Sequence, residues 1–426
     1  MTASHPRHRG SRAGHSAARG VARAGVAIFA TILAGQARAQ SPADARDERR
    51  LDIGLNVSGF YDSDVLRGDT IRAVRPDAKK EDFIISPRLT ADIVAPIGRQ
   101  AAFLNGQLGY QFHKNNGYLD RESINAQGGF RLRPLRGCMA TVTGQYTQQQ
   151  SELYDIVQGF DPTNVEKIGG VTTSLACQMA SGLAPSISAG RTRAKNSSRE
   201  LQVNEYVNDS VQASLGYSRP QLGTVSVYAS IAKSRYPLRR ALLPGTPADG
   251  ANVYSTGLGY ERQIGTRLTG SANIGYTRVN PRLPGTPDFK GASWDVDLTY
   301  DSRNRFRGSV SFARSVEQSN LIGDTYGINT SLRFTGDYAF NERFRLTAGA
   351  AYIRRKQEQS PLFQLPNFNS RDRTVSVYSR LTAGNVGPVG IAFDVSREHR
   401  KSVVPIYNYG STRFGVTATF NWGRNR

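Results

Sequence analysis

The sequence predicts an all-β chain: a transmembrane antiparallel up-and-down β-barrel of about 18 strands, with short periplasmic turns and long extracellular loops. Three observations predict this fold class. Apolar or permissive residues recur at every second position through most of the chain, which is the period of a strand with one apolar face. Short turns alternate with long polar loops between these runs. No stretch reaches the roughly 18–20 apolar residues that a spanning helix needs.

An internal repeat shows the pattern most clearly. The pentapeptide LPGTP at 243–247 returns at 283–287. After each copy come a run with period two, a short polar turn and a second run. Because Pro and Gly mark loops and the period of two marks strands, each copy is expected to be a long loop followed by a hairpin.

The same period predicts every strand along the chain. The expected strands are 51–62, 83–94, 101–112, 122–133, 138–149, 167–177, 184–194, 207–218, 223–235, 251–262, 266–278, 291–301, 305–317, 325–338, 343–356, 372–383, 388–400 and 409–422. A tilted strand of about ten residues crosses the apolar layer of an outer membrane. Since closure leaves no open edge in lipid, the apolar face should point outward and the polar face inward.

Aromatic residues near the predicted strand ends match the girdles that such barrels place at the membrane interfaces. They are Tyr217, Tyr260, Tyr300, Tyr338, Phe344 and Trp422. A soluble sandwich is the alternative fold, but it would need a second sheet to cover each apolar face. The membrane barrel is therefore the fold that we expect.

The N-terminus has the layout of a secretory signal peptide. Arginines precede an apolar run at 26–34, and Ala37-Arg38-Ala39 supplies small residues at the cleavage positions. A basic amphipathic tail is the alternative interpretation. We therefore expect a signal peptide at 1–39, a short periplasmic segment at 40–50 and the barrel at 51–426.

Charge and composition limit the classes of partner. Hydrophobic residues are only 38% of the chain, and its formal net charge is +21. An excess of this size implies an anionic partner, such as nucleic acid, lipid head groups or an acidic polymer. Export makes nucleic acid the least suitable of these, so no nucleic-acid partner is expected.

Two cysteines, Cys138 and Cys177, are the whole thiol content. They fall at the periplasmic ends of adjacent predicted strands, and in an oxidising compartment we expect a disulfide between them. Two unpaired small residues are the alternative. Only His113 and His399 follow the signal peptide, so no metal site, cofactor or catalytic triad is expected, and the sequence does not predict an enzyme.

Strand parity predicts a basic lumen. The arginines expected to line the pore are Arg88, Arg131, Arg133, Arg307, Arg333, Arg345, Arg380 and Arg413. The acids expected opposite them are Asp92, Asp295, Asp297 and Asp394. A surplus of guanidinium groups suits carboxylate or phosphate ligands and selects for anions. Arginines that pair with lumenal acids and only brace the wall are the alternative.

Several segments carry a resemblance to a known family. Residues 206–209, 215–223 and 234–237 resemble a hairpin, and 59–67 with 83–89 resemble the opening, of a family of β-barrel porins linked with exopolysaccharide loci. The resemblance implies a location in the Gram-negative outer membrane. It also implies an association with secreted polysaccharide, and it supplies no catalytic residues.

These observations lead to an expected function. The chain should be an outer-membrane channel that passes an anionic exopolysaccharide, or another anionic solute, through a basic lumen. A general or anion-selective nutrient porin and a non-conducting structural or surface-binding barrel are the alternatives. Outer-membrane lipid, lipopolysaccharide, acidic polysaccharide and periplasmic export or synthesis proteins are the expected partners, and the barrel is expected to be a monomer.

Overall fold

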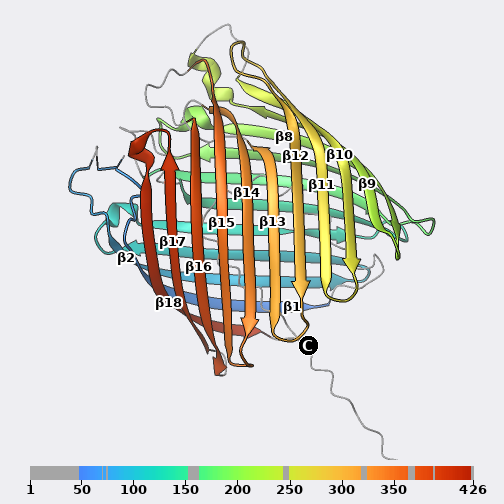
Figure 1. Cartoon of the computed structure of the whole chain (residues 1–426), viewed down its shortest axis with the longest axis horizontal. Helices are drawn as coiled ribbons and strands as arrows, with labels where there is room; N and C mark the ends of the chain where they lie inside the picture. Colours follow the sequence, from blue (N-terminus) through green and yellow to red (C-terminus); the bar gives the residue numbers. More distant parts are fainter. Residues whose placement is uncertain are drawn as a thin grey trace, which may run out of the picture.

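The computed structural model describes residues 48–69, 71–72, 75–151, 163–242, 249–317, 324–362, 370–386 and 389–423. Within these ranges the chain forms a closed antiparallel barrel of 18 strands (Figure 1). No helix in the described ranges is long and apolar enough to cross a membrane. The predicted signal peptide at 1–39, most of the segment 40–50 and the first pentapeptide at 243–247 lie outside these residues.

The strands confirm the predicted fold class and strand order. They are β1 Arg50–Asp62, β2 Asp82–Ile97, β3 Gln100–His113, β4 Arg121–Leu132, β5 Cys138–Gln150, β6 Val165–Cys177, β7 Leu183–Asn196, β8 Tyr206–Arg219, β9 Gly223–Arg235, β10 Gly250–Ile264, β11 Leu268–Pro281, β12 Phe289–Asp301, β13 Phe306–Glu317, β14 Asp324–Ala339, β15 Phe344–Gln359, β16 Arg371–Val386, β17 Val389–Ser402 and β18 Tyr409–Gly423. Short 3-10 helices lie in the long loops: η1 Gly117–Leu119, η3 Gln202–Asn204, η4 Pro237–Leu242 and η5 Pro405–Tyr407. The predicted bounds differ from these only at the strand ends.

Pairing of the first and last strands closes the sheet. β1 pairs with β2 on one side and with β18 on the other, and both ladders run along nearly its whole length. Every strand therefore has two hydrogen-bonded neighbours, which satisfies backbone N–H and C=O groups that lipid could not. Closure also removes the edges at which a sheet of this size would aggregate.

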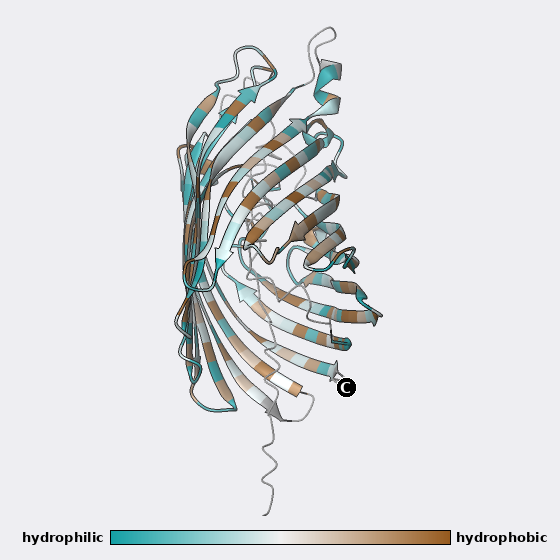
Figure 2. Cartoon of the chain, turned by 90° about the vertical axis from the view of Figure 1, so that its right-hand side faces the viewer, coloured by the Kyte–Doolittle hydropathy of each residue, from teal (hydrophilic) through white to brown (hydrophobic). Residues whose placement is uncertain are grey.

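The outer face of the barrel is apolar and the inner face is polar. On β9, the exposed side chains of Val225, Val227 and Ile231 alternate with Ser226 and Ser230. Figure 2 shows the same alternation of hydrophobic and hydrophilic residues along many strands. Exposed apolar side chains on a closed barrel have no protein to cover them, so this face meets lipid.

An aromatic girdle lies on the outer face at the end of the short turns. All the aromatic residues predicted for it are exposed there: Tyr217, Tyr260, Tyr300, Tyr338, Phe344 and Trp422. Amphipathic rings prefer the boundary between lipid and water. The closed barrel, its apolar band and this girdle together place the chain in the Gram-negative outer membrane, with the short turns on the periplasmic side.

The two cysteines meet at the periplasmic rim. Cys138 begins β5 and lies opposite Cys177, which ends β6. Their sulfur atoms are bonded, at 2.15 Å. The turn before Cys138 needs a glycine, because Gly137 has φ of +77° and a Cβ there would lie 2.5 Å from the carbonyl oxygen of Gln178. The disulfide thus fixes the first residue pair of this hairpin.

Candidate functional site: the lumen and its mouth

All the arginines predicted for the pore lie at inward positions of the barrel wall. Arg88 on β2 is an example. The exposed residues Phe83, Ile85 and Leu89 of this strand point outward, and Arg88 is an odd number of residues away from each of them, so its side chain points inward. Arg133 differs slightly, because it lies one residue beyond the end of β4. The structure then separates these arginines by what each one contacts.

Arg380 and Arg413 belong to ion-pair networks of the wall. Arg380 Nε lies 2.5 Å from Asp394 Oδ1, and its Nη2 lies 3.1 Å from Asp394 Oδ2. Asp394 also accepts a hydrogen bond from the hydroxyl of Thr417 at 3.1 Å. Arg413 Nη2 donates to Asp62 at 2.8 Å. For these two arginines, the alternative in which lumenal charges brace the wall describes the contacts.

Arg131 and Arg133 lie near the periplasmic end of the lumen and contact the wall. The guanidinium of Arg131 lies 4.8 Å from the centre of the Phe103 ring, a cation–π distance. Arg133 donates from Nη1 to the carbonyl oxygen of Arg99 at 3.2 Å, and its backbone N–H donates to Gln100 at 2.6 Å. Both residues are thus held close to the short turns.

The remaining arginines form no salt bridge within the described residues. They are Arg88, Arg307, Arg333 and Arg345. Arg307, Arg333 and Arg345 lie on three consecutive strands, β13, β14 and β15, and Arg307 and Arg345 are exposed to the lumen. Arg307, Arg333 and Arg345 are named the lumenal arginine column. Acids of the wall stand nearby: Arg307 lies opposite Asp301 on β12 and Asp337 on β14, and Glu317 of β13 lies close enough to Arg333 for their charges to interact.

Acidic residues stand beside this column. Asp295 and Asp297 occupy neighbouring inward positions of β12, the strand that pairs with β13. Asp92, the other predicted lumenal acid, lies 3.0 Å from Arg50 Nη1 at the periplasmic rim. The inner wall therefore places acids on β12 beside the arginines of β13 to β16, so its electrostatic field varies across the barrel as well as along it.

Two tyrosines lie flat against the inner wall, and the sequence reasoning missed both. A Cβ on Gly257 or Gly275 would lie 2.7 or 2.5 Å from the hydroxyl oxygen of Tyr228, so this ring covers both glycines. Tyr378 covers Gly349 in the same way, at 2.6 Å. The signal that could have found them is a lumenal glycine on the strand beside a lumenal tyrosine.

The first extracellular loop folds inward over the mouth. Its residues Val65, Leu66 and Ile71 are buried in one apolar cluster with Ile84 of β2, and Phe60 of β1 packs against it. Phe60 and Ile84 both occupy inward positions of their strands. The loop that follows β1 therefore covers part of the lumenal wall, rather than extending away from the rim.

An ionic network anchors this loop. Asp62, at the end of β1, is fully buried and accepts from Arg67 Nη2 and Arg413 Nη2, each at 2.8 Å. Ser411 donates to the same carboxylate at 2.6 Å. Arg67 also lies 5.7 Å from the centre of the Tyr409 ring. One carboxylate thus joins β1, β18 and the loop between β1 and β2.

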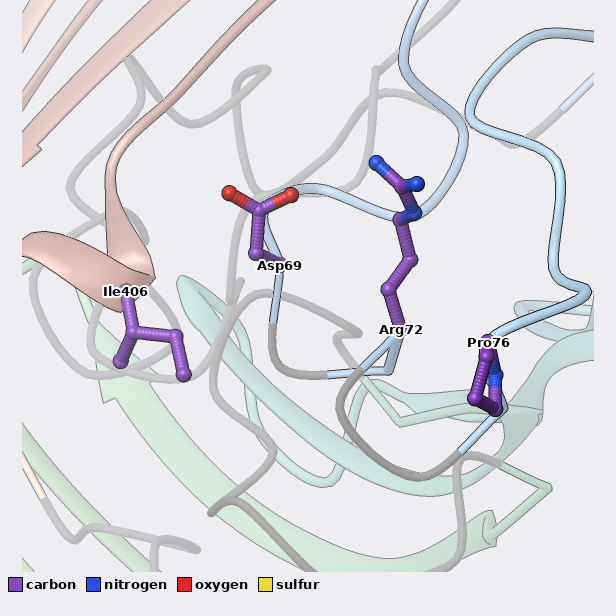
Figure 3. Close-up of a pocket in the computed structure, with 4 residues that line it drawn as sticks. All are labelled: Asp69, Arg72, Pro76 and Ile406. Carbon is purple, nitrogen blue, oxygen red and sulfur yellow. The ribbon is translucent and has the colours of Figure 1, made fainter.

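A shallow hollow opens between this loop and the loop that contains η5. It has a volume of about 420 Å³ and is lined by Asp69, Arg72, Pro76 and Ile406. Figure 3 shows the charged groups of Asp69 and Arg72 on the same stretch of loop, across from Ile406. The hollow lies at the extracellular mouth, with both charges accessible to a solute that enters there.

A second network ties three other extracellular segments together. Arg239 of η4 is fully buried; it donates to Asp249 at 2.8 Å, to Asn204 at 2.9 Å and to the carbonyl oxygen of Asp324 at 2.6 Å. Its guanidinium lies 3.9 Å from the centre of the Tyr236 ring. Arg239 therefore links η4 to η3 and to the start of β14.

The upper ends of β10, β11 and β12 cover the upper end of β14. Ala251, Val279, Tyr326 and Ile328 form one buried cluster, and Phe289 packs against it. The β12–β13 ladder ends at the pair Trp294 and Arg314, below the extracellular end of β12. The start of β14 therefore lies inside the wall of its neighbours and narrows the mouth from a second side.

The two histidines in the described part of the chain lie on different strands, β3 and β17. His113 Nδ1 lies 3.2 Å from Asp120 Oδ1 at the extracellular end of β3. His399 is on β17, at an outward position, and faces away from the lumen. Among the residues that the structure describes, no group of His, Cys, Asp and Glu side chains could hold a metal ion.

Comparison with known proteins does not assign a family to this chain. No family model and no curated protein matches the sequence. Solved structures with a similar fold include Pseudomonas aeruginosa OccK2 (OpdF) in complex with glucuronate, at 11% identity and a TM-score of 0.45, over 88% of this chain and 98% of that chain. Another is the siderophore receptor PirA of the same species, at 8% identity and a TM-score of 0.43, over 89% of this chain and 81% of that chain. At these scores, no function is transferred from either protein.

Proposed function

We propose that the chain is an outer-membrane channel that conducts anions. The lumenal arginine column carries this proposal, because Arg307, Arg333 and Arg345 form no salt bridge within the described residues and Arg307 and Arg345 are exposed to the lumen. A ring or column of basic side chains in a pore favours anions and repels cations. Arg88 adds a further charge, since it lies close enough to Arg380 for their charges to interact.

The physical basis is the balance of charge along the conducting path. Arg380 and Arg413 are paired, so their charges are offset by Asp394 and Asp62. The column forms no such close ion pair, although Asp301 and Asp337 stand opposite Arg307, and at an ionic strength of 0.1 M its field reaches about 10 Å into the lumen. A carboxylate or phosphate that passes can accept two parallel hydrogen bonds from one guanidinium.

The finer proposal is that the anionic solute is an acidic exopolysaccharide. The resemblance of 59–67 and 215–223 to exopolysaccharide-linked porins supports it, and so does the pair of flat tyrosines. Tyr228 and Tyr378 offer ring faces to the lumen while their hydroxyl groups bond to the wall, Tyr378 to Thr335 at 3.2 Å. A sugar ring has both apolar C–H faces and hydroxyl groups, which suits such a surface. Transport would be passive, so periplasmic export or synthesis proteins must drive it.

The mouth favours a second candidate, a porin for small anionic solutes. The loop after β1 and the start of β14 both pack inside the wall, which leaves less room for a polymer than for a small carboxylate. If these loops close the mouth completely, the barrel is instead a structural or surface-binding one. The three functions differ in conductance and in their response to a polymer.

Single-channel recording in planar bilayers tests the proposal. With a salt gradient across the membrane, the wild type should show a reversal potential of the sign that indicates anion selectivity. The variant R307Q/R333Q/R345Q should lose most of that selectivity. The control variant K233Q/R278Q/K290Q removes the same charge from outward positions of β9, β11 and β12 and should behave like the wild type.

The same recordings separate the finer proposals. Block of the current by an added acidic polysaccharide, weakened in the lumenal variant, supports polymer passage. Anion current that the polymer does not change supports the small-solute porin. An absence of current in a correctly folded barrel contradicts every channel function and leaves the structural one.

A further inference from the structure

A row of basic side chains lies on the outward face at the extracellular ends of β15, β16 and β17. Arg354 stands directly opposite Arg373, and Arg373 stands directly opposite Lys401. All three side chains are exposed. They share the parity of the exposed lipid-facing residues further down their strands, such as Tyr352 and Val375. Arg354, Arg373 and Lys401 are named the outer basic row.

The outer basic row lies at the upper boundary of the apolar band. Arg373 is two residues from Val375 along β16, which is about 6.6 Å along the strand. A tilt of about 45° reduces that separation to roughly 5 Å along the membrane normal. The charges therefore stand just above the hydrocarbon, where lipid head groups lie.

The charges of this row are not offset by the protein. None of the three residues forms a salt bridge in the described part of the chain. The acid on the same face of β15, Glu358, already lies 2.6 Å from Lys356 Nζ. Like charges directly opposite one another destabilise a sheet. An anion that bridges the row would remove this repulsion.

The outer surface is not basic at this height all the way around. The extracellular ends of β2 and β3 carry exposed Phe83, Ile85 and Phe112 on their outward faces. Other opposed basic pairs lie at this end of the barrel: Lys167 and Lys195 on β6 and β7, and Arg278 and Lys290 on β11 and β12. The outer basic row differs from these pairs because it joins three consecutive strands, β15 to β17.

We infer that the outer basic row binds the phosphate groups of lipopolysaccharide, the phosphorylated glycolipid of the outer leaflet. Arginine forks match phosphate oxygens, and basic clusters at a membrane boundary bind anionic head groups. The apolar residues below, including Tyr352 and Val375, would contact the acyl chains of the same molecule. A soluble anion would gain nothing from that apolar surface, which is why a lipid is the occupant that fits.

Native mass spectrometry of the purified barrel in a neutral detergent tests this inference, with bis-phosphorylated lipid A as the probe. The variant R354Q/R373Q/K401Q should bind the probe roughly 100-fold more weakly, at about fivefold for each charge removed. The conservative variant R354K/R373K keeps the charges and should retain most of the affinity. Lipid A without phosphates should bind the wild type and the glutamine variant equally.

A charge-matched control guards against a general effect of net charge. The variant R262Q/R267Q/R305Q loses three exposed charges at or near the periplasmic turns and should bind lipid A like the wild type. Three results would each overturn the inference: unchanged affinity in the row variant, an equal loss of affinity in the control variant, or binding of phosphate-free lipid A to the wild type as tightly as bis-phosphorylated lipid A. If the triple variant does not fold, R373Q alone carries the test, with an expected loss of about fivefold.

Discussion

Replacing Arg239 by methionine should loosen the extracellular loops without opening the barrel. Arg239 and Asp249 form a salt bridge in which both side chains are fully buried. The variant R239M leaves the Asp249 carboxylate, the Asn204 side chain and the carbonyl oxygen of Asp324 without these donors. Breaking one side of a buried pair costs about 3–5 kcal/mol, because the remaining charge stays buried and unpaired.

This free-energy cost should appear as local opening of the extracellular loop, because the hydrogen bonds between the strands do not involve the Arg239 side chain. A loss of about 3–5 kcal/mol raises the open fraction roughly 150- to 5,000-fold. Hydrogen exchange measured by mass spectrometry on a peptide covering 236–242 reports this opening, because the amide of Tyr236 donates to the backbone carbonyl oxygen of Asp249 at 2.9 Å in the closed loop. Peptides from the middle of the strands should exchange as slowly as in the wild type.

The matched control is R240M, which changes the exposed neighbouring residue of η4 and should leave exchange unchanged. In a double-mutant cycle, R239M/D249N should exchange more slowly than the sum of the single effects predicts, because it removes the unpaired charge. Equal exchange in R239M and R240M would refute the reasoning, and so would strict additivity in the cycle.

Three further predictions concern the wall, the rim and the pore. Replacing Gly349 by alanine places a Cβ about 2.6 Å from the Tyr378 ring, so the ring must leave the wall and single-channel conductance should fall, whereas G169A, where a Cβ meets no atom within 4 Å, should not change it. Reduction of the Cys138–Cys177 bond should add two mass units to the intact protein; the variant C138S/C177S should lose up to about 4 kcal/mol of unfolding free energy in urea. Raising the salt from 0.1 to 1 M shortens the screening length from about 10 to 3 Å, so anion selectivity measured by reversal potential should weaken, and constant selectivity would contradict an electrostatic mechanism.

The sequence predicts the fold well because the fold rests on a local pattern. A period of two determines which residues of a strand face lipid, and exposed apolar residues recur with this period along the strands. The side on which Arg88 or Arg307 lies follows from that period alone. Cys138 and Cys177 could likewise be matched, because both fall beside short turns and therefore at the periplasmic ends of two adjacent strands.

The contacts within the site could not be predicted, because they depend on segments far apart in the sequence. Whether Arg413 is paired depends on Asp62, which reaches it only because β1 and β18 close the barrel. The network of Arg239 draws on three segments whose meeting no periodicity encodes. Apolar residues in the first loop, such as Leu66, indicate that a buried cluster forms. They do not indicate that this cluster lies on the lumenal wall.

At the extracellular ends of β15 and β16, adjacent residues of one strand face two different environments, the lumen and the lipid head groups. Arg355 points inward and binds Asp372, which is fully buried and also contacts Arg400. Arg354 and Arg373, one residue away on each strand, point outward and stand opposite each other without a carboxylate. A carboxylate on the outer face would lie against anionic head groups, whereas on the inner face it can offset an arginine that has left water. The alternation of the strands thus places Asp372 on the inner face with its two arginines and leaves Arg354 and Arg373 on the outer face, available to lipid.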